Sequence, residues 1–119
     1  MALLFGLSTL FAFFISFSMQ FIVIHQFGVK SLLGPQPDFN TPGSESSMIF
    51  EKIKELYWSS YRTFKHGAFH GTLTGLLLVM PAIATNALFE GRGFKYIAIT
   101  AGYWIVSMAL MGGVICAFL

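Results

Sequence analysis

Charged side chains are unusually scarce in this sequence. Asp, Glu, Lys and Arg make up only 10% of its 119 residues, whereas a soluble globular domain usually contains about 25%. Hydrophobic residues make up 55% of the chain, so too few polar side chains remain to cover a surface that faces water. The composition excludes an ordinary soluble domain. It predicts a single membrane domain over residues 1–119, with the lipid bilayer as its first partner.

Other scarcities exclude further classes of protein. The single cysteine, Cys116, cannot form a disulfide within the chain, and a net charge of +2 is too small to indicate a nucleic-acid partner. The sequence has no phosphate-binding glycine loop, no Ser-His-Asp set and no C-x-x-C pair. We therefore predict no catalytic residue and no cofactor, and we do not expect an enzyme.

Long apolar stretches are abundant by contrast. They cover about residues 2–29, 67–89 and 96–119, and every charged side chain lies outside them. Each is long enough to cross a bilayer as a helix, which takes about 20 residues, and a spanning segment must satisfy its own backbone hydrogen bonds. The sequence therefore predicts an all-α membrane protein with three transmembrane helices.

The segments between the apolar stretches have distinct characters. Three prolines break residues 30–47 into a loop, whereas residues 48–64 place apolar and charged side chains on opposite faces of a helix. We expect this amphipathic helix to lie at the membrane interface or to lead directly into the second span. The short link EGRGFK, residues 90–95, predicts that the last two spans form a tight antiparallel hairpin.

Basic residues near the spans predict the orientation. Five of them lie between residues 30 and 65, and only two, Arg92 and Lys95, lie in the short link. Because basic loops tend to stay on the cytoplasmic side, we expect the long loop and the C-terminus to be cytoplasmic. The membrane that we expect is the bacterial inner (plasma) membrane.

Small residues recur at every fourth position in all three predicted spans. Such stripes let helix backbones approach closely, which is a main source of helix association in lipid. The stripes of the last two spans lie at matching distances from the short link, so we predict that they pack on each other; a homodimer interface is the alternative. The predicted packing residues are Gly67, Gly71, Gly75, Ala109, Gly113 and Ala117, and the first span carries Ser8, Ala12 and Ser16.

Histidines at the ends of the spans form a second candidate site. His25 lies at the end of the first span, and His66 and His70 stand one helical turn apart at the start of the second, so the connectivity brings all three to one membrane face. Such imidazoles can bind a transition metal or carry protons. Amphipathic histidines are also ordinary at membrane interfaces, and the segment HGAFH lacks the glutamate of a zinc-protease motif. We therefore predict no metal.

Asn86 and Tyr103 complete the possible polar site. Asn86 is a strong polar group near the end of the second span. We expect it to cap backbone groups near the short link or to bond across to Thr100 or Tyr103, with a substrate contact as the alternative. Pro81 lacks a backbone donor and predicts a kink in the same span.

The second half of the chain resembles a known membrane family. The shared motifs are Gly71 and Gly75, residues 81–86, residues 88–92, and residues 102–104 followed by Met111 and Gly112. They are similar to motifs of the domain of unknown function (DUF) 1761 family, small membrane proteins with several spans, and the likeness is closest over residues 61–118. It implies a helical membrane fold without an assigned activity, and it implies that Asn86, Glu90, Arg92 and Tyr103 belong to a shared pattern. The resemblance also implies that the family's first helix, of four, is missing here.

Three functions fit these observations. The leading hypothesis is a non-catalytic accessory subunit or homo-oligomer whose partner is itself or another membrane protein, because three helices bury few side chains together. The alternative is a small oligomeric transporter or channel built around Thr72, Thr74, Asn86 and Thr100. The third is a metal or redox subunit that uses the three histidines.

Overall fold

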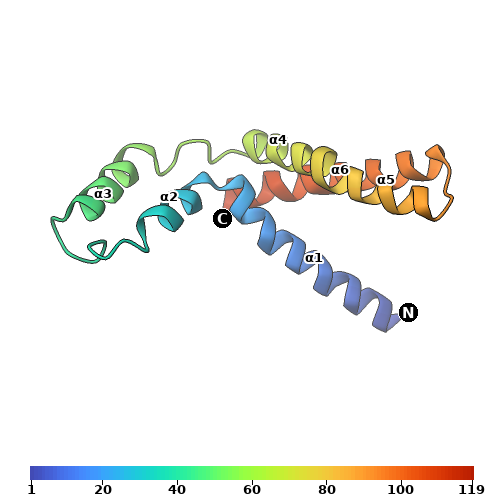
Figure 1. The fold of residues 1–119 in the computed structure, drawn as a ribbon, viewed down its shortest axis with the longest axis horizontal. Coiled ribbons are helices and arrows are strands. Elements are labelled where there is room, and N and C mark those ends of the chain that lie inside the picture. Colours follow the sequence, from blue (N-terminus) through green and yellow to red (C-terminus); the bar gives the residue numbers. More distant parts are fainter.

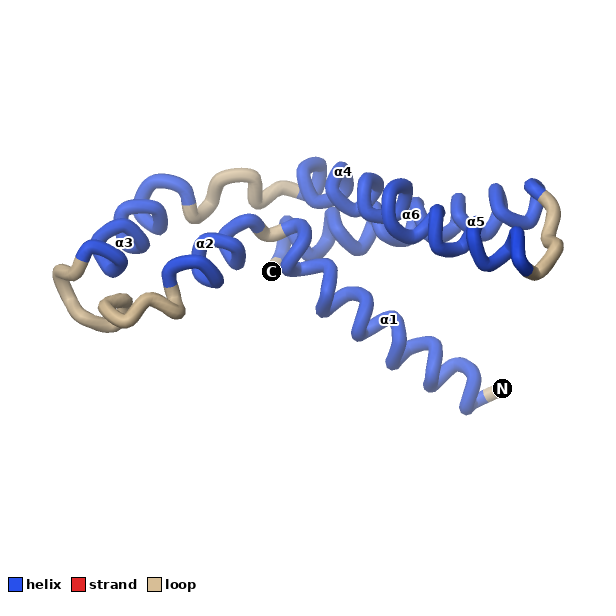
Figure 2. Tube along the Cα trace, viewed as in Figure 1, coloured by secondary structure: helices blue, strands red, loops and turns tan.

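The computed structural model describes the backbone of all 119 residues and the side chains of all of them except Leu4, Leu7, Ser8 and Phe11. The predicted stripe residue Ser8 therefore lies outside the described side chains. Over the described chain the structure contains helices joined by short loops and no strand (Figure 2). The helices in chain order are α1 (Ala2–Val23), α2 (His25–Leu33), α3 (Glu45–Tyr57), α4 (Phe64–Thr74), the π-helix η1 (Gly75–Val79), α5 (Met80–Phe89) and α6 (Phe94–Phe118).

Two continuous helical segments are long and apolar enough to cross a membrane. They are Phe64–Phe89, which joins α4, η1 and α5, and Phe94–Phe118, which is α6. The bent pair of α1 and α2 is a candidate for a third span. The predicted all-α membrane class is confirmed.

The first apolar stretch forms two helices, where a single helix over residues 2–29 was expected. Ile24 between them has extended backbone angles, φ −105° and ψ 97°, and the axis turns by 76° there. The break is held by Gln26, whose side chain donates to the carbonyls of Trp58 and Ser60 at 2.8 and 3.1 Å. Apolar composition cannot reveal such a break, because these partners are 32 and 34 positions away in the sequence.

The amphipathic helix α3 begins and ends earlier than the expected range 48–64. Ser44 caps its first turn by accepting a hydrogen bond from the Ser47 amide at 3.3 Å. A turn separates α3 from α4, and Tyr61 in that turn has a left-handed φ of 62°, which a helix cannot contain. The helices α2 and α3 pack against each other beyond one end of the α4–α6 hairpin (Figure 1), and the loop between them covers residues 34–44 where 30–47 was expected.

The last two spans form the predicted tight antiparallel hairpin, which is confirmed. Its turn places Gly91 at a φ of 68°, a left-handed value that glycine adopts without steric cost. The first arm loosens into π-helical turns ahead of Pro81, where the Met80 amide bonds to the Gly75 carbonyl. Because proline offers no amide to the helix, this local change of register takes the place of a sharp kink.

Glycines set the close approach of α4 and α6. A Cβ atom on Gly67 would overlap the Gly112 carbonyl, and one on Gly71 would overlap the Met108 carbonyl. A Cβ on Gly75 would lie 2.8 Å from the Ile105 Cα atom. The sequence predicted a partner stripe on α6 that begins at Ala109, one residue after the observed contact at Met108. One residue turns a helix by about 100°, so the closest contacts use the neighbouring face.

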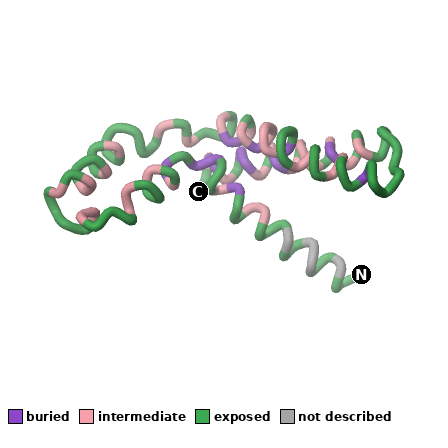
Figure 3. Tube along the Cα trace, in the orientation of Figure 1, coloured by how far each residue is buried: buried purple, intermediate pink, exposed green. Residues whose placement is uncertain are grey.

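Buried side chains gather where α1 meets the hairpin (Figure 3). Met19, Val23 and Ile24 from the end of α1 pack with Met108 and Cys116 of α6. The described side chains of residues 2–14 in α1 are exposed. Among the side chains that the structure describes, those that fix the first helix to the hairpin lie in its C-terminal half.

Candidate functional site

The three histidines of the chain meet at the end of the bundle that carries the C-terminus. His25 is the first residue of α2, and His66 and His70 occupy the first two turns of α4. The Nε2 atoms of His25 and His66 lie 2.9 Å apart, and one ring nitrogen from each of the three histidines lies within 4.8 Å of the others. We call these residues the histidine cluster.

Two local features place His25 beside α4. The extended backbone at Ile24 ends α1 and redirects the chain by 76°, and the neighbouring Gln26 is buried and bonded to the turn that precedes α4. These bonds tie the start of α2 to the start of α4. The position of His25 thus depends on contacts outside its own helix.

The other two histidines are placed by the start of α4. The Thr63 hydroxyl caps this helix by accepting from the His66 amide at 3.2 Å. A separation of four residues puts His66 and His70 on one helix face, and their ring centroids lie 4.5 Å apart. The Tyr61 ring lies 5.1 Å from that of His66, and the Phe69 ring lies 5.6 Å from that of His70.

The histidine cluster is open on one side. His25 is exposed, whereas His66 and His70 are half-buried. The ring nitrogens are therefore accessible from outside the protein. Neutral imidazole nitrogens in this arrangement can accept hydrogen bonds, exchange protons or coordinate a metal ion.

A network of backbone contacts supports the cluster from the C-terminal end of α6. The Cys116 thiol is fully buried, and its single S–H lies within hydrogen-bond distance of two acceptors, the carbonyls of Val23 and Tyr61, at 3.5 and 3.2 Å. Arg62 donates from Nε to the Cys116 carbonyl at 3.1 Å, where a helix C-terminus favours a cation. Sequence reasoning missed Gln26, Arg62 and Cys116 as supports; only Gln26, a polar residue at the end of an apolar run, gave a signal.

Asn86 and Tyr103 lie apart from the histidine cluster. Tyr103 is 67% exposed on the outside of α6. Among the described residues, no side chain or backbone group forms a hydrogen bond with the Asn86 amide, so the expected bonds to Thr100 and Tyr103 are not made. Asn86 and Thr100 do line one small pocket beside the hairpin turn.

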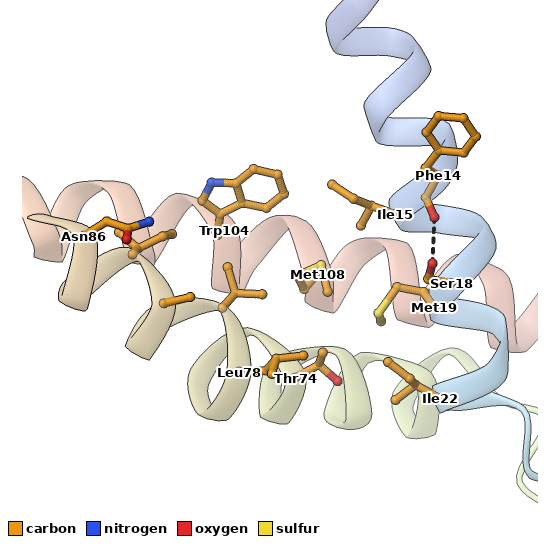
Figure 4. A pocket seen from close by; sticks show the side chains of 13 residues that line it. Phe14, Ile15, Ser18, Met19, Ile22, Thr74, Leu78, Asn86, Trp104 and Met108 are labelled. Atoms are coloured by element: carbon orange, nitrogen blue, oxygen red, sulfur yellow. Dashed lines mark hydrogen bonds between the residues drawn. The ribbon is translucent and has the colours of Figure 1, made fainter.

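A larger cleft opens between α1 and the hairpin (Figure 4). Its volume is about 560 Å³, and most of its lining is apolar. Residues from both walls include Phe14, Ile15 and Met19 of α1, Leu78 of η1, Asn86 of α5 and Trp104 of α6. The cleft exists because α1 leaves the hairpin beyond its C-terminal half.

Two hydroxyl groups in the cleft are already bonded. Ser18 donates to the Phe14 carbonyl at 3.0 Å, the bond drawn in Figure 4, and Thr74 donates to the His70 carbonyl at 2.8 Å. Thr72, another residue of the expected pore, donates to the Ala68 carbonyl. The cleft therefore offers a binding partner the Asn86 carboxamide, with two N–H donors and a carbonyl acceptor, and the indole N–H of Trp104.

Comparisons with known proteins identify a family and no individual relative. Neither the curated proteins nor the solved structures contain a match to this chain. The family model described as "Protein of unknown function (DUF1761)" matches residues 1–116. The resemblance seen in the second half of the sequence therefore extends over nearly the whole chain. The chain belongs to the DUF1761 family of proteins of unknown function.

Proposed function

We propose that the chain is a non-catalytic membrane subunit that assembles with a second copy of itself through the cleft between α1 and the hairpin. The observation that carries this proposal is the exposed Asn86 amide on a wall of that apolar cleft. An accessory role beside another membrane protein is the other form of the same hypothesis, and the experiment below separates the two.

The shape of the first helix supports assembly. Helices in lipid associate through close packing and interhelical hydrogen bonds, because lipid tails are as apolar as leucine. The α4–α6 hairpin has such packing at its glycines, whereas the described side chains of residues 2–14 are exposed. Side chains of a second copy can fill the wedge that α1 leaves open.

The chemistry of Asn86 favours a second copy as the occupant. A carboxamide has two N–H donors and a carbonyl acceptor, so two asparagines related by a two-fold axis satisfy each other. Most homo-oligomers are built around such axes. Lipid tails could fill the apolar part of the cleft equally well, but they offer the amide no partner.

Disulfide cross-linking tests this arrangement in native membranes. We expect Asn86→Cys to form a covalent dimer under mild oxidation, because the two copies of residue 86 would lie beside the axis. The matched control is Leu77→Cys, which is 69% exposed on the same arm but outside the cleft. Wild type gives the background, since its single cysteine, Cys116, is buried.

Each outcome has a definite meaning. Dimer formation by Asn86→Cys well above both controls supports a second copy in the cleft. Equal cross-linking by Leu77→Cys would indicate random collision and would contradict the proposal. A covalent adduct of Asn86→Cys with a different membrane protein would replace self-assembly by the accessory role.

A further inference from the structure

We propose that the histidine cluster is a binding site for a divalent transition-metal ion, coordinated by one ring nitrogen each from His25, His66 and His70. Zn²⁺ is the ion whose geometry fits best. This inference is independent of assembly through the cleft, because none of the three histidines lines the cleft.

The distances between the nitrogens suit a tetrahedral ion. Zinc–imidazole bonds of about 2.0–2.1 Å place the ligand nitrogens roughly 3.3 Å apart in a tetrahedron. The observed contact between His25 and His66 is 2.9 Å, and the three nitrogens lie within 4.8 Å of one another. Small rotations of the imidazole side chains bring these distances to the required value without moving a helix.

A simple hydrogen bond accounts for only part of the cluster. One neutral imidazole could donate to the other across the 2.9 Å contact between His25 and His66. His70 is left out of that bond, yet its ring lies 5.0 Å from that of His25 and 4.5 Å from that of His66. A metal ion gives all three converging rings the same partner.

The backbone around the ligands is held before any ion binds. The buried Gln26 fixes the start of α2 to the residues preceding α4, and the Thr63 cap and the Gly67 contact fix the first turn of α4. Tyr61, which packs on His66, sits in the left-handed region. This conformation is strained for a non-glycine residue, and strained residues concentrate at functional sites.

The donor set leaves a coordination position for an external ligand. The group that can hold an ion consists of three histidines, without a carboxylate or thiolate among the described residues. Three protein ligands with an open fourth position are typical of exchangeable or reactive zinc sites, whereas structural sites usually have four. The exposure of His25 gives water or an anion access to that position.

Cobalt provides the most direct measurement. All three histidines of the chain are in the cluster, so protein purified without a histidine tag has no competing imidazole. We expect wild type in detergent to bind one Co²⁺ per chain, with the visible absorption of a tetrahedral ion, and Zn²⁺ to displace it. His25→Ala, His66→Ala and His70→Ala should each weaken binding by at least about tenfold, the lower end of the losses seen even for outer-shell changes.

Two controls keep the result interpretable. Near-ultraviolet absorption shows whether the thiol takes part, because Co²⁺ bound to a thiolate has a charge-transfer band there and Co²⁺ bound only to imidazoles does not; we expect no such band, since the Cys116 thiol is buried against backbone carbonyls. Helix content by circular dichroism checks that each histidine variant is folded. His25→Ala is the most informative variant, because His25 is exposed and its loss should leave the packing intact.

The proposal has clear contrary outcomes. Absence of Co²⁺ and Zn²⁺ binding by folded wild type would overturn it. Binding that survives unchanged in all three histidine variants would place the ion elsewhere and would overturn it as well. Assembly through the cleft can fail or succeed without altering either result, because Asn86 contributes no ligand to the cluster.

Discussion

Gly71 shows how much a single missing side chain contributes to this fold. A Cβ atom at this position would overlap the Met108 carbonyl and lie 2.9 Å from the Ala109 Cα atom. We expect Gly71→Ala to push α4 away from α6 and to lower the free energy of unfolding by about 1–3 kcal/mol, the usual cost of overpacking. Titration of the purified protein with a denaturing detergent, followed by circular dichroism, measures the difference.

Gly102 is the matched control within the same hairpin. A Cβ atom there would have no described atom within 4 Å, so Gly102→Ala should be neutral or slightly stabilising, because alanine favours a helix by up to about 1 kcal/mol. A similar loss of stability in both variants would contradict the importance of the close approach and would indicate a general intolerance of larger residues.

The sequence predicted the contact face of α6 with an error of one residue. The spacing of small residues predicted Ala109 and Gly113, whereas a Cβ on Gly71 or Gly67 would first meet Met108 or Gly112. Residues at equal distances from the hairpin turn lie at the same level along the two helix axes. Equal distance does not determine which face of each helix makes the contact. The π-helical turns of η1 change the register of the first arm, and composition gave no sign of them.

At the scale of helices, apolar length predicted the spans and the hairpin turn, but it did not predict the break in the first stretch. Hydropathy is a local property, whereas the break at Ile24 is held by a glutamine that bonds to residues 58 and 60. The same reason limits the candidate site. Connectivity predicted that the histidines share one end of the bundle, while their convergence depends on the direction in which α2 leaves α1.

Replacement of Gln26 tests whether its hydrogen bonds to distant residues hold the break between α1 and α2. Gln26→Leu removes two hydrogen bonds to backbone carbonyls, and each such bond contributes about 0.5–1.5 kcal/mol. We expect the free energy of unfolding to fall by about 1–3 kcal/mol, and hydrogen exchange to accelerate in α2 and in residues 58–63. Hydrogen–deuterium exchange with mass spectrometry measures both regions in one experiment.

Gln36→Leu controls for the loss of a glutamine as such. The Gln36 side chain is exposed and donates only to the Leu32 carbonyl, at 3.4 Å, so its replacement should leave exchange in α2 close to that of wild type. Unchanged exchange in the Gln26 variant would show that the bend between α1 and α2 is fixed by other contacts.

On the scale of the whole molecule, the two ends of the bundle differ in character. The histidine cluster, α2, α3 and the C-terminus occupy one end, and the hairpin turn lies at the other (Figure 1). The end with α2 and α3 carries five basic residues and the turn carries two. Because the more basic side usually faces the cytoplasm, we predict that a metal ion would reach the cluster from the cytoplasmic side.

A matched pair of cysteine substitutions tests this orientation. Glu51 on α3 and Glu90 in the turn have similarly exposed side chains, 65% and 59%, and each forms one surface ion pair, which contributes little to stability. In intact cells a membrane-impermeant maleimide should label Glu90→Cys, and it should reach Glu51→Cys only in inverted membrane vesicles. The reverse pattern would place the histidine cluster outside the cytoplasm, whereas labelling of both variants from one side would contradict the crossing of the hairpin itself.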